Sequence, residues 1–277
     1  MLCHDKAVLK KIQKTFILGV GAQKSGTSWL YQYLRQNKHF DGGSLKEYHM
    51  WNYLDDHEER SRIDNSNYLN YLTKPGLIYR KFFQKKMRRS ESFYFDYFES
   101  LLDEDIRITA DITPAYCILD ADRMTHIRSN FAKRNILVKS VFIIRDPVDR
   151  VISSARMVYK RKKTSEAFND FLQVFYRSTF CQKRTHYHDT ILSMRSAFPE
   201  DHLIVEPYES LFTAPSISKV SDFLDVTYRP EFIQKKVFEG SYRPEVDSEI
   251  RGDIRDFYSD VYSFCFDSFP ETQKFWT

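Results

Sequence analysis

The chain lacks the features that mark membrane, secreted and metal-stapled proteins. It has four cysteines among 277 residues, and their spacing contains neither a Cys-x-x-Cys pair nor another zinc-ligand pattern. Free thiols in a reducing compartment are the simplest interpretation. The first residues contain no apolar signal core, and no apolar run approaches the length of a membrane span. We therefore expect a cytoplasmic protein with no membrane span and no bound metal.

Strong charge asymmetry, internal repeats and linker-like segments are also missing. The chain carries 42 lysines and arginines against 38 acidic residues, a net charge of +4. This small excess is untypical of a nucleic-acid-binding domain but suits an enzyme with an anionic substrate. A hydrophobic content of 42% is enough for one large core. We expect a single domain over residues 1–277, with 1–14 as a lead-in; no feature indicates the oligomeric state.

The most informative segment of the chain is residues 15–37. Its apolar run from Phe16 to Val20 predicts a buried strand, and a turn of small residues follows. Apolar residues then recur at helical spacing from Trp29 onward. A strand, a glycine turn and a helix form a phosphate cradle, because backbone N–H groups and the positive end of the helix dipole converge there.

This turn is close to the loop of nucleoside-triphosphate-binding proteins but departs from it in one respect. Gly21 and Gly26 have the expected spacing, but Thr27 stands where that loop has its lysine, and Lys24 lies inside the turn. A hydrophobic strand ending in a lone aspartate, which such proteins use to hold Mg²⁺, is not evident. Taken alone, the segment also fits a glycine turn that binds nothing.

A second strand-to-helix junction occupies residues 141–154. Asp146 is a candidate N-cap, and the proline after it suits the first helical turn. Arg145, at the strand end, has the geometry to clamp a phosphate in a bidentate manner, and Ser153 lies about two turns into the helix. The alternative is a capped helix whose Arg145 and Arg150 make surface ion pairs.

The rest of the chain alternates strands and helices. Residues 38–105 predict helices and loops that cap a sheet. Further strands are expected over 106–111, 136–145 and 202–206, and helices over 121–133, from 146 to about 160, and over 166–179, 182–197, 217–224 and 250–269. This alternation predicts an α/β fold, with helices on both faces of a parallel sheet.

Two motifs together resemble the sulfotransferase family. They are Gln23-Lys-Ser-Gly-Thr-Ser28 and the Arg-Asp-Pro-x-x-Arg-x-x-Ser pattern from Arg145 to Ser153. The similarity extends over about residues 15–270, although only these two loops are specific. The resemblance implies a P-loop-like, three-layer fold with a central parallel sheet flanked by helices. It also implies transfer of a sulfuryl group from 3′-phosphoadenosine-5′-phosphosulfate (PAPS), which leaves adenosine 3′,5′-bisphosphate (PAP).

The resemblance also implies which residues bind the donor. The first loop would hold the 5′-phosphate, and Lys24 would contact the bridging or leaving oxygen. Arg145 and Ser153 would hold the 3′-phosphate, and Arg243, in a poorer match, is a further donor contact. The implied donor-binding residues are Gln23, Lys24, Ser25, Gly26, Thr27, Ser28, Arg145, Ser153 and Arg243.

A third segment, Lys46-Glu-Tyr-His-Met-Trp51, resembles one found in carbohydrate sulfotransferases. By this resemblance Glu47 is the general base, and Lys46 helps neutralise the sulfuryl oxygens. His49 is the alternative base, as in the small-molecule branch of the family, and on a strand it would point to the same side as Glu47. Without the resemblance, the residues favour an exposed ion pair between Lys46 and Glu47.

Three further features bear on function: one departure from the sulfotransferase pattern and two runs of basic residues. Ile112 stands where glycosaminoglycan sulfotransferases carry a lysine, in the segment 108–116 that otherwise resembles theirs. The runs Lys85–Arg89 and Lys160–Lys163 are typical of solvated helix faces, and the second could instead lie near the donor.

We expect a PAPS-dependent sulfotransferase that acts on a hydroxyl of a carbohydrate or glycan, with PAPS as co-substrate and PAP as product. A small non-sugar metabolite is the alternative acceptor. A P-loop kinase that requires Mg²⁺, and a non-catalytic nucleotide-binding module, are the alternatives from other classes. No nucleic-acid partner is expected.

Overall fold

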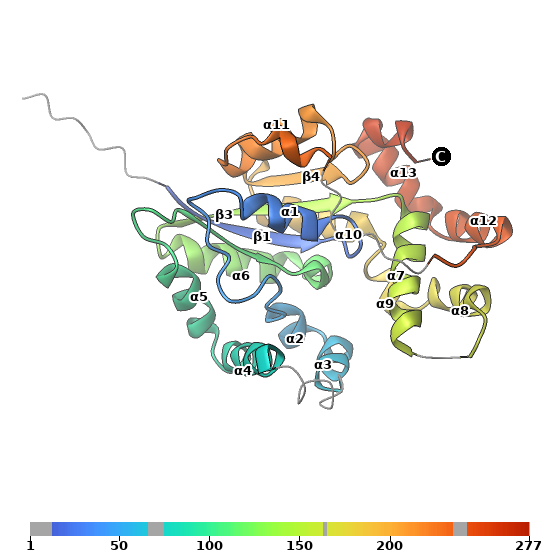
Figure 1. Ribbon diagram of the computed structural model, residues 1–277, viewed down its shortest axis with the longest axis horizontal. Coiled ribbons are helices and arrows are strands. Elements are labelled where there is room, and N and C mark those ends of the chain that lie inside the picture. The colour runs from blue at the N-terminus through green and yellow to red at the C-terminus, as the bar shows by residue number, and fades with distance from the viewer. Residues whose placement is uncertain (1–12, 66–74, 163–164, 235–242, 277) are drawn as a thin grey trace, which may run out of the picture.

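A parallel four-stranded sheet forms the centre of the molecule (Figure 1). The computed structural model describes residues 13–65, 75–162, 165–234 and 243–276. The strands are β1 (Lys14–Gly21), β2 (Ile108–Ile112), β3 (Ile136–Ile144) and β4 (Leu203–Pro207), in the order β2-β1-β3-β4. The predicted strands are confirmed, with ends shifted by one or two residues.

Both faces of the sheet are buried, as the apolar sequence of β1 requires. Phe16, Leu18 and Val20 point into one core, and Ile17 points into the other. This alternation follows from the two-residue repeat of a strand. The two cores make the predicted three-layer α/β fold.

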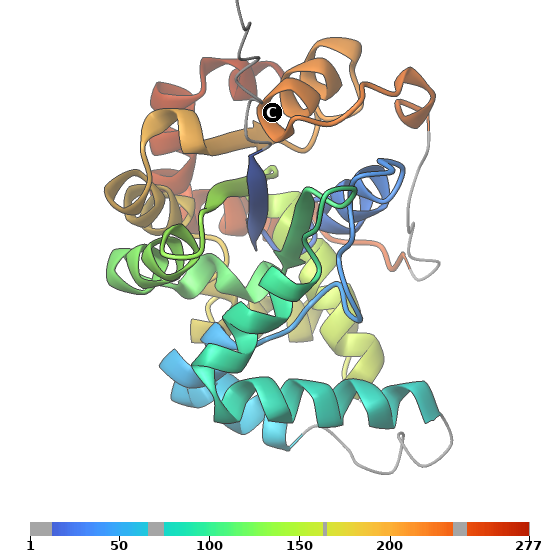
Figure 2. The same cartoon turned by 90° about the vertical axis from the view of Figure 1, so that its left-hand side faces the viewer.

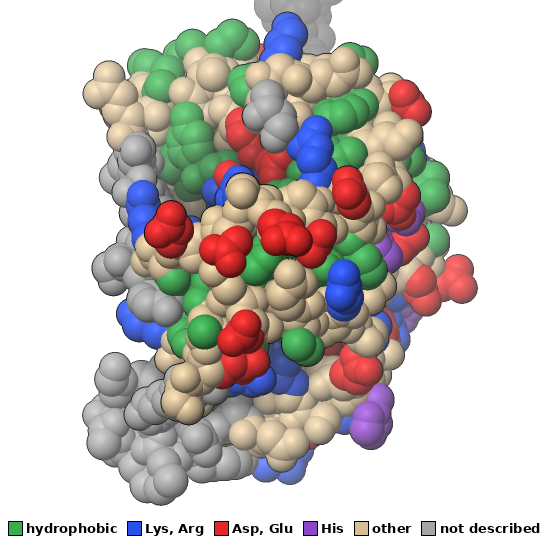
Figure 3. All heavy atoms as spheres, turned by 90° about the vertical axis from the view of Figure 1, so that its right-hand side faces the viewer, with side chains coloured by type: hydrophobic (Ala, Val, Ile, Leu, Met, Phe, Trp, Pro, Cys, Tyr) green, Lys and Arg blue, Asp and Glu red, His purple; other side chains and the backbone are tan. Residues whose placement is uncertain are grey.

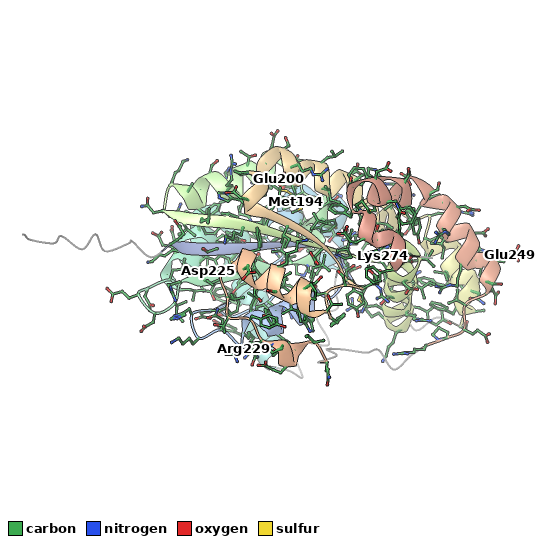
Figure 4. The ribbon with its side chains drawn as sticks, turned by 90° about the horizontal axis from the view of Figure 1, so that it is seen from above. Met194, Glu200, Asp225, Arg229, Glu249 and Lys274 are labelled. Carbon is green, nitrogen blue, oxygen red and sulfur yellow. The ribbon has the colours of Figure 1, made fainter. Side chains whose placement is uncertain are left out.

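Different sets of helices cover the two faces of the sheet. The helices α1 (Thr27–Leu34) and α11 (Ala214–Leu224) pack on one face. The helices α5 (Glu91–Ser100), α6 (Ala121–Ala132) and α10 (Tyr187–Ala197) pack on the other. Figure 2 looks along the strands, with α1 and α6 on opposite sides of the sheet. Figure 4 shows the same division from above, with Met194 of α10 and Arg229, beyond α11, on opposite sides of the strands.

The remaining helices lie at the ends of these layers. The segment 38–105, in which helices and loops were expected, contains α2 (Trp51–Asp55), α3 (His57–Asp64), α4 (Pro75–Arg89) and α5. The helices α7 (Pro147–Lys162), α8 (Phe168–Phe175), α9 (Thr179–Gln182), α12 (Ser248–Phe257) and α13 (Ser259–Ser268) gather near the end of the molecule where the strands finish (Figure 1). None of the helices in the described part of the chain has the length and apolar character needed to cross a membrane.

Several predicted helices have different bounds from those expected, and the segment 250–269 contains two helices, α12 and α13, instead of one. The helix expected over 182–197 begins only at Tyr187, because the chain between α9 and α10 turns at residues 183–185. The helix expected over 166–179 is the shorter α8 followed by a turn, after which α9 begins at Thr179 with the Ser178 side chain as its N-cap. Side-chain caps therefore divide segments that periodicity alone joins.

Candidate functional site

The turn between β1 and α1 has the backbone of an anion-binding loop. Gly26 is the N-cap of α1 with φ of 88°, and an added Cβ would lie 2.8 Å from the Tyr208 ring. Lys24 also has a positive φ, 73°. Among the described residues, no side chain caps α1 and its first turn has no acidic residue. The first amides of α1 are therefore available to an anionic ligand, as predicted.

Arg145, at the end of β3, lies directly against this turn. Its Nη1 donates to the carbonyl oxygen of Lys24 at 3.2 Å, and its guanidinium lies 4.8 Å from the centre of the Tyr208 ring. The two predicted phosphate motifs are thus brought together at one edge of the sheet. Arg145 also pairs with Asp149 at 3.5 Å, which leaves most of its hydrogen-bonding capacity for a ligand.

Positive charge accumulates around Lys24. Burial lowers the pKa of Lys24, and the charges of Arg145 and Arg161 lower it further. Arg161 belongs to the basic run 160–163, so part of this run does lie near the predicted donor loop. An anion placed here would relieve the repulsion and restore the pKa of Lys24.

The N-terminus of α7 is built as its sequence predicts. The Asp146 carboxylate accepts from the backbone N–H of Asp149 at 2.9 Å and from the Tyr262 hydroxyl at 2.9 Å. The interpretation of Arg150 as a surface residue is wrong. Arg150 is fully buried, and its Nη2 lies 2.9 Å from Cys181 Sγ.

Two residues of α7 near the predicted 3′-phosphate ligand Ser153 contribute to the site, namely Ser154 and Arg156. Ser153 is half-buried, and its neighbour Ser154 donates to Oε1 of Gln23 at 3.1 Å, which ties α7 to the first loop. Arg156 follows Ser153 by three residues and so shares its face of the helix. Burial lowers the pKa of Arg156, and the nearby charge of Arg243 lowers it further.

Arg156 was missed by sequence reasoning, although its spacing from Ser153 was a usable signal. Arg243 is the first residue described after 235–242, and it is exposed. Residues 241 and 242, which precede Arg243 in the poorer match, lie outside the described residues. The structure thus brings Arg243 to the same cationic cluster as Arg145 and Arg156.

The third predicted segment forms a compact group beside the first loop. Nζ of Lys46 donates to Oε1 of Glu47 at 2.8 Å and to the Thr27 hydroxyl at 3.3 Å. Nε2 of His49 lies 3.3 Å from Oε2 of Glu47. Burial raises the pKa of Glu47, but the hydrogen bond with His49 and the charge of Lys46 outweigh burial and hold it at about 2. Both candidate bases therefore touch each other, and Lys46 joins them to the loop.

The prediction that Glu47 and His49 point to the same side because they lie on a strand is wrong. Residues 46–50 are irregular and do not form a strand, and His49 has φ of 52°. The two side chains meet because the backbone turns between them.

A buried carboxylate that sequence reasoning missed holds this irregular segment in place. Asp111, at the end of β2, accepts from the hydroxyls of Thr113 at 2.6 Å, Tyr116 at 2.7 Å and Tyr94 at 3.0 Å. The backbone N–H of Tyr48 donates to Thr113 Oγ1 at 3.0 Å and lies 3.3 Å from Asp111 Oδ1. Asp111 and Thr113 thus fix the residue between the two candidate bases.

Ile112 lies within this support. Its side chain is fully buried in the core beneath α1, and its backbone N–H donates to the Lys46 carbonyl oxygen at 3.0 Å. In the described part of the chain, the ammonium group nearest the candidate bases therefore comes from Lys46 rather than from position 112.

The remaining basic run lies on α4. Lys85, Lys86 and Arg89 line a surface groove of about 460 Å³ together with Phe82 and Phe93. Nζ of Lys86 lies 4.1 Å from the centre of the Phe93 ring. Elsewhere on α4, Gln84 Nε2 donates to the Glu47 carbonyl at 3.0 Å, so this helix also borders the candidate site. Figure 3 faces the end of the molecule where the strands finish, and charged and apolar side chains are interspersed there.

Comparisons with known proteins agree with this geometry. The sequence profile described as "Sulfotransferase domain" matches residues 14–244. No curated protein sequence matches the chain. A sulfotransferase from Alicyclobacillus acidocaldarius has a TM-score of 0.61 at 16% identity, covering 92% of this chain and 96% of that chain. The sulfotransferase domain from the curacin biosynthetic pathway has a TM-score of 0.48 at 17% identity, and the match covers 81% of this chain and 78% of that chain. A mouse sulfotransferase complexed with PAP has a TM-score of 0.40 at 14% identity, and the match covers 80% of this chain and 62% of that chain.

Asp111 gives the stability of the protein a pH dependence that can be measured. Burial raises its pKa from 3.8 to about 6, although the hydroxyls of Thr113 and Tyr116 lower it. The folded state therefore holds an extra proton between these values, so the contribution is present at low pH and is lost as pH rises through 6. Relative to Asp111→Asn, the native chain should gain about 2 kcal/mol of unfolding free energy between pH 7 and pH 4.5.

Urea denaturation of both proteins at the two pH values measures this difference. Asp170→Asn, a change at an exposed carboxylate of α8, is the matched control. Equal differences at pH 7 and pH 4.5 for Asp111→Asn would show that the buried group does not titrate in this range.

Proposed function

The chain belongs to the sulfotransferase family and is a PAPS-dependent enzyme, and we propose that it moves the sulfuryl group to a hydroxyl of a carbohydrate. The observation that carries the proposal is the contact of Lys46 with both Thr27 of the first loop and Glu47. It joins a phosphate-binding turn to a carboxylate and an imidazole within one site.

We assign the donor to the cationic edge of the sheet. The amides of Ser25 to Ser28 and the hydroxyls of Thr27 and Ser28 would bind the 5′-phosphate at the positive end of α1. Arg145 and Ser153 would bind the 3′-phosphate, with Arg156 and Arg243 adding positive charge. Gln23 would act indirectly, because its side chain accepts from Ser154 and so fixes the turn against α7.

The proposed reaction forms one bond to sulfur and breaks one. The acceptor oxygen attacks the sulfur atom, and the bond from sulfur to the 5′-phosphate oxygen of the donor breaks, which releases PAP. The acceptor proton moves to a base of the enzyme. Negative charge grows on the phosphate oxygen, and Lys24, in the loop that holds this phosphate, would stabilise it.

Glu47 is the proposed base, and His49 is the alternative. A carboxylate with a pKa of about 2 accepts a proton weakly, so the hydrogen bond with His49 and the ion pair with Lys46 both oppose base catalysis by Glu47. If Lys46 turns from Glu47 toward the sulfuryl oxygens, the pKa of Glu47 rises. Lys46 would thus couple donor binding to the readiness of the base.

The nature of the acceptor rests on two features of the chain. The segment 46–49 resembles the one in carbohydrate sulfotransferases, and the α4 groove presents cations together with the exposed ring of Phe82 and the half-buried ring of Phe93. Aromatic faces with adjacent cations suit an anionic sugar. A small non-sugar metabolite remains the second candidate.

The unpaired thiols of Cys117, Cys181 and Cys265 support a reducing location such as the cytoplasm.

Donor binding can be tested by calorimetric titration with PAP. Arg145→Ala should weaken PAP binding by about 10- to 100-fold, since a hydrogen bond between charged groups contributes about 1.5–3 kcal/mol. Arg134→Ala is the control, because Arg134 pairs with Asp96 and Glu99, two residues on α5. Preferential binding of ATP with Mg²⁺ over PAP would favour the kinase alternative, and an unchanged PAP affinity in Arg145→Ala would contradict the assignment.

Turnover with PAPS and a panel of sugar acceptors tests the base. Glu47→Gln should lower kcat by about 100-fold or more, as loss of a general base does, while PAP affinity stays within about twofold. Arg123→Gln, which breaks the ion pair with Asp55, is the matched control. Full activity of Glu47→Gln together with an inactive His49→Asn would move the role of base to His49. Binding of PAP without turnover on any acceptor would favour the non-catalytic module.

A further inference from the structure

A group of metal-ligand residues lies at the start of α10 and takes no part in the proposed reaction. His186, His188 and Asp189 each offer one ligand atom, and these atoms all lie within 4.8 Å of one another. The His186 and His188 rings are stacked with their centres 5.3 Å apart. Asp189 lies between their nitrogens, with oxygens 3.9 Å from His186 Nδ1 and 3.4 Å from His188 Nε2.

These distances are close to those of a bound transition metal. Zn²⁺ binds imidazole nitrogen and carboxylate oxygen at about 2.0–2.2 Å, so ligand atoms in a tetrahedral site lie about 3.4 Å apart. The Asp189 carboxylate already has this separation from His188. Small rotations of the His186 side chain would bring its ligand nitrogen to a similar separation from the other two ligand atoms. Two imidazoles and one carboxylate are a set that Zn²⁺ accepts, with water in the fourth position.

The surroundings hold two of the ligands and leave the third open to solvent. The His186 ring packs against Tyr258 at 5.7 Å, and the His188 ring packs against Phe264 at 5.9 Å. Asp189 is 70% exposed, which leaves room for water or an exchangeable ligand.

The other histidine–carboxylate contacts of the described chain lack a comparable set of three. His202 contacts Asp201 at 3.9 Å, His126 contacts Glu91 at 2.8 Å and His49 contacts Glu47 at 3.3 Å, each as a pair. The sequence alone does not identify His186-Tyr-His-Asp189 as a metal site. His188 and Asp189 follow His186 by two and three residues, and at this spacing the three side chains meet only if the backbone turns. The turn occurs here because His186 is the N-cap of α10 and precedes its first turn.

We propose that His186, His188 and Asp189 bind one Zn²⁺ ion. The site would stabilise the start of α10, since two of its ligands flank Tyr187. The Tyr187 ring is buried against Phe142 of β3, and its hydroxyl donates to the Arg145 carbonyl oxygen at 2.8 Å. A metal ion here would therefore restrain the segment that supports the donor-binding arginine, without touching the reacting groups.

Calorimetric titration with ZnCl₂ tests the site directly. The full chain is used without a histidine tag and with Cys3→Ser, so that the N-terminal thiol does not compete for the metal. We expect one Zn²⁺ per chain and a rise in melting temperature on saturation. His188→Ala should weaken Zn²⁺ binding at least tenfold, and His202→Ala, which alters a two-residue pair, should leave it unchanged.

A second variant and a spectroscopic measurement guard against a folding defect. Asp189→Asn changes an exposed side chain and should also weaken binding, and circular dichroism checks that each variant is folded. Co²⁺ should give visible d–d absorption of a four-coordinate site, without the near-ultraviolet band of thiolate ligation. The proposal is overturned if folded His188→Ala and Asp189→Asn bind Zn²⁺ as the parent chain does, or if the parent binds no Zn²⁺ at concentrations up to 1 mM, roughly the weak limit of specific binding.

Discussion

The parallel pairing of β1 with strands on both of its sides is the constraint on which the site depends. β1 pairs with β2 through Gly19 opposite Ile112, and with β3 through Gly21 opposite Phe142. Because all three strands run in the same direction, their carboxyl ends meet at one edge. The anion-binding turn, the Asp111 support and Arg145 are the continuations of these strands. Gly19 makes the pairing possible, since an added Cβ would lie 2.7 Å from Ile112 Cδ1.

Features encoded over short distances could be predicted from the sequence. The apolar runs specify the strands, and the small residues after β1 specify the turn that leads into α1. Asp146 followed by proline specifies the start of α7. In each case the residues that determine the structure are adjacent in the chain, so hydrophobic periodicity and capping preferences are sufficient.

Features that depend on distant contacts could not be predicted. The shape of 46–50 is set by Asp111 and Thr113, more than sixty residues away along the chain. The burial of Arg150 depends on α9, which supplies Cys181. The sequence predicted Arg145 and Arg243 separately, but their gathering with Arg156 into one cationic cluster depends on how β3, α7 and the segment at 243 pack together. Tertiary packing determines all three outcomes.

Lys46 supplies the ammonium group beside the proposed base Glu47. Ile112 buries its side chain in the core, so β2 contributes a buried support at the position where the sequence resemblance led us to look for a lysine. The ammonium group is supplied instead by a segment that β2 holds through backbone hydrogen bonds. Lys46 can therefore be displaced from Glu47 without disturbing the strand. The hydrogen bond with His49 and the charge of Lys46 keep the Glu47 carboxylate ionised, and in the proposed mechanism a donor that draws Lys46 away would remove the second of these effects. A base regulated in this way would avoid proton transfer until the donor is bound.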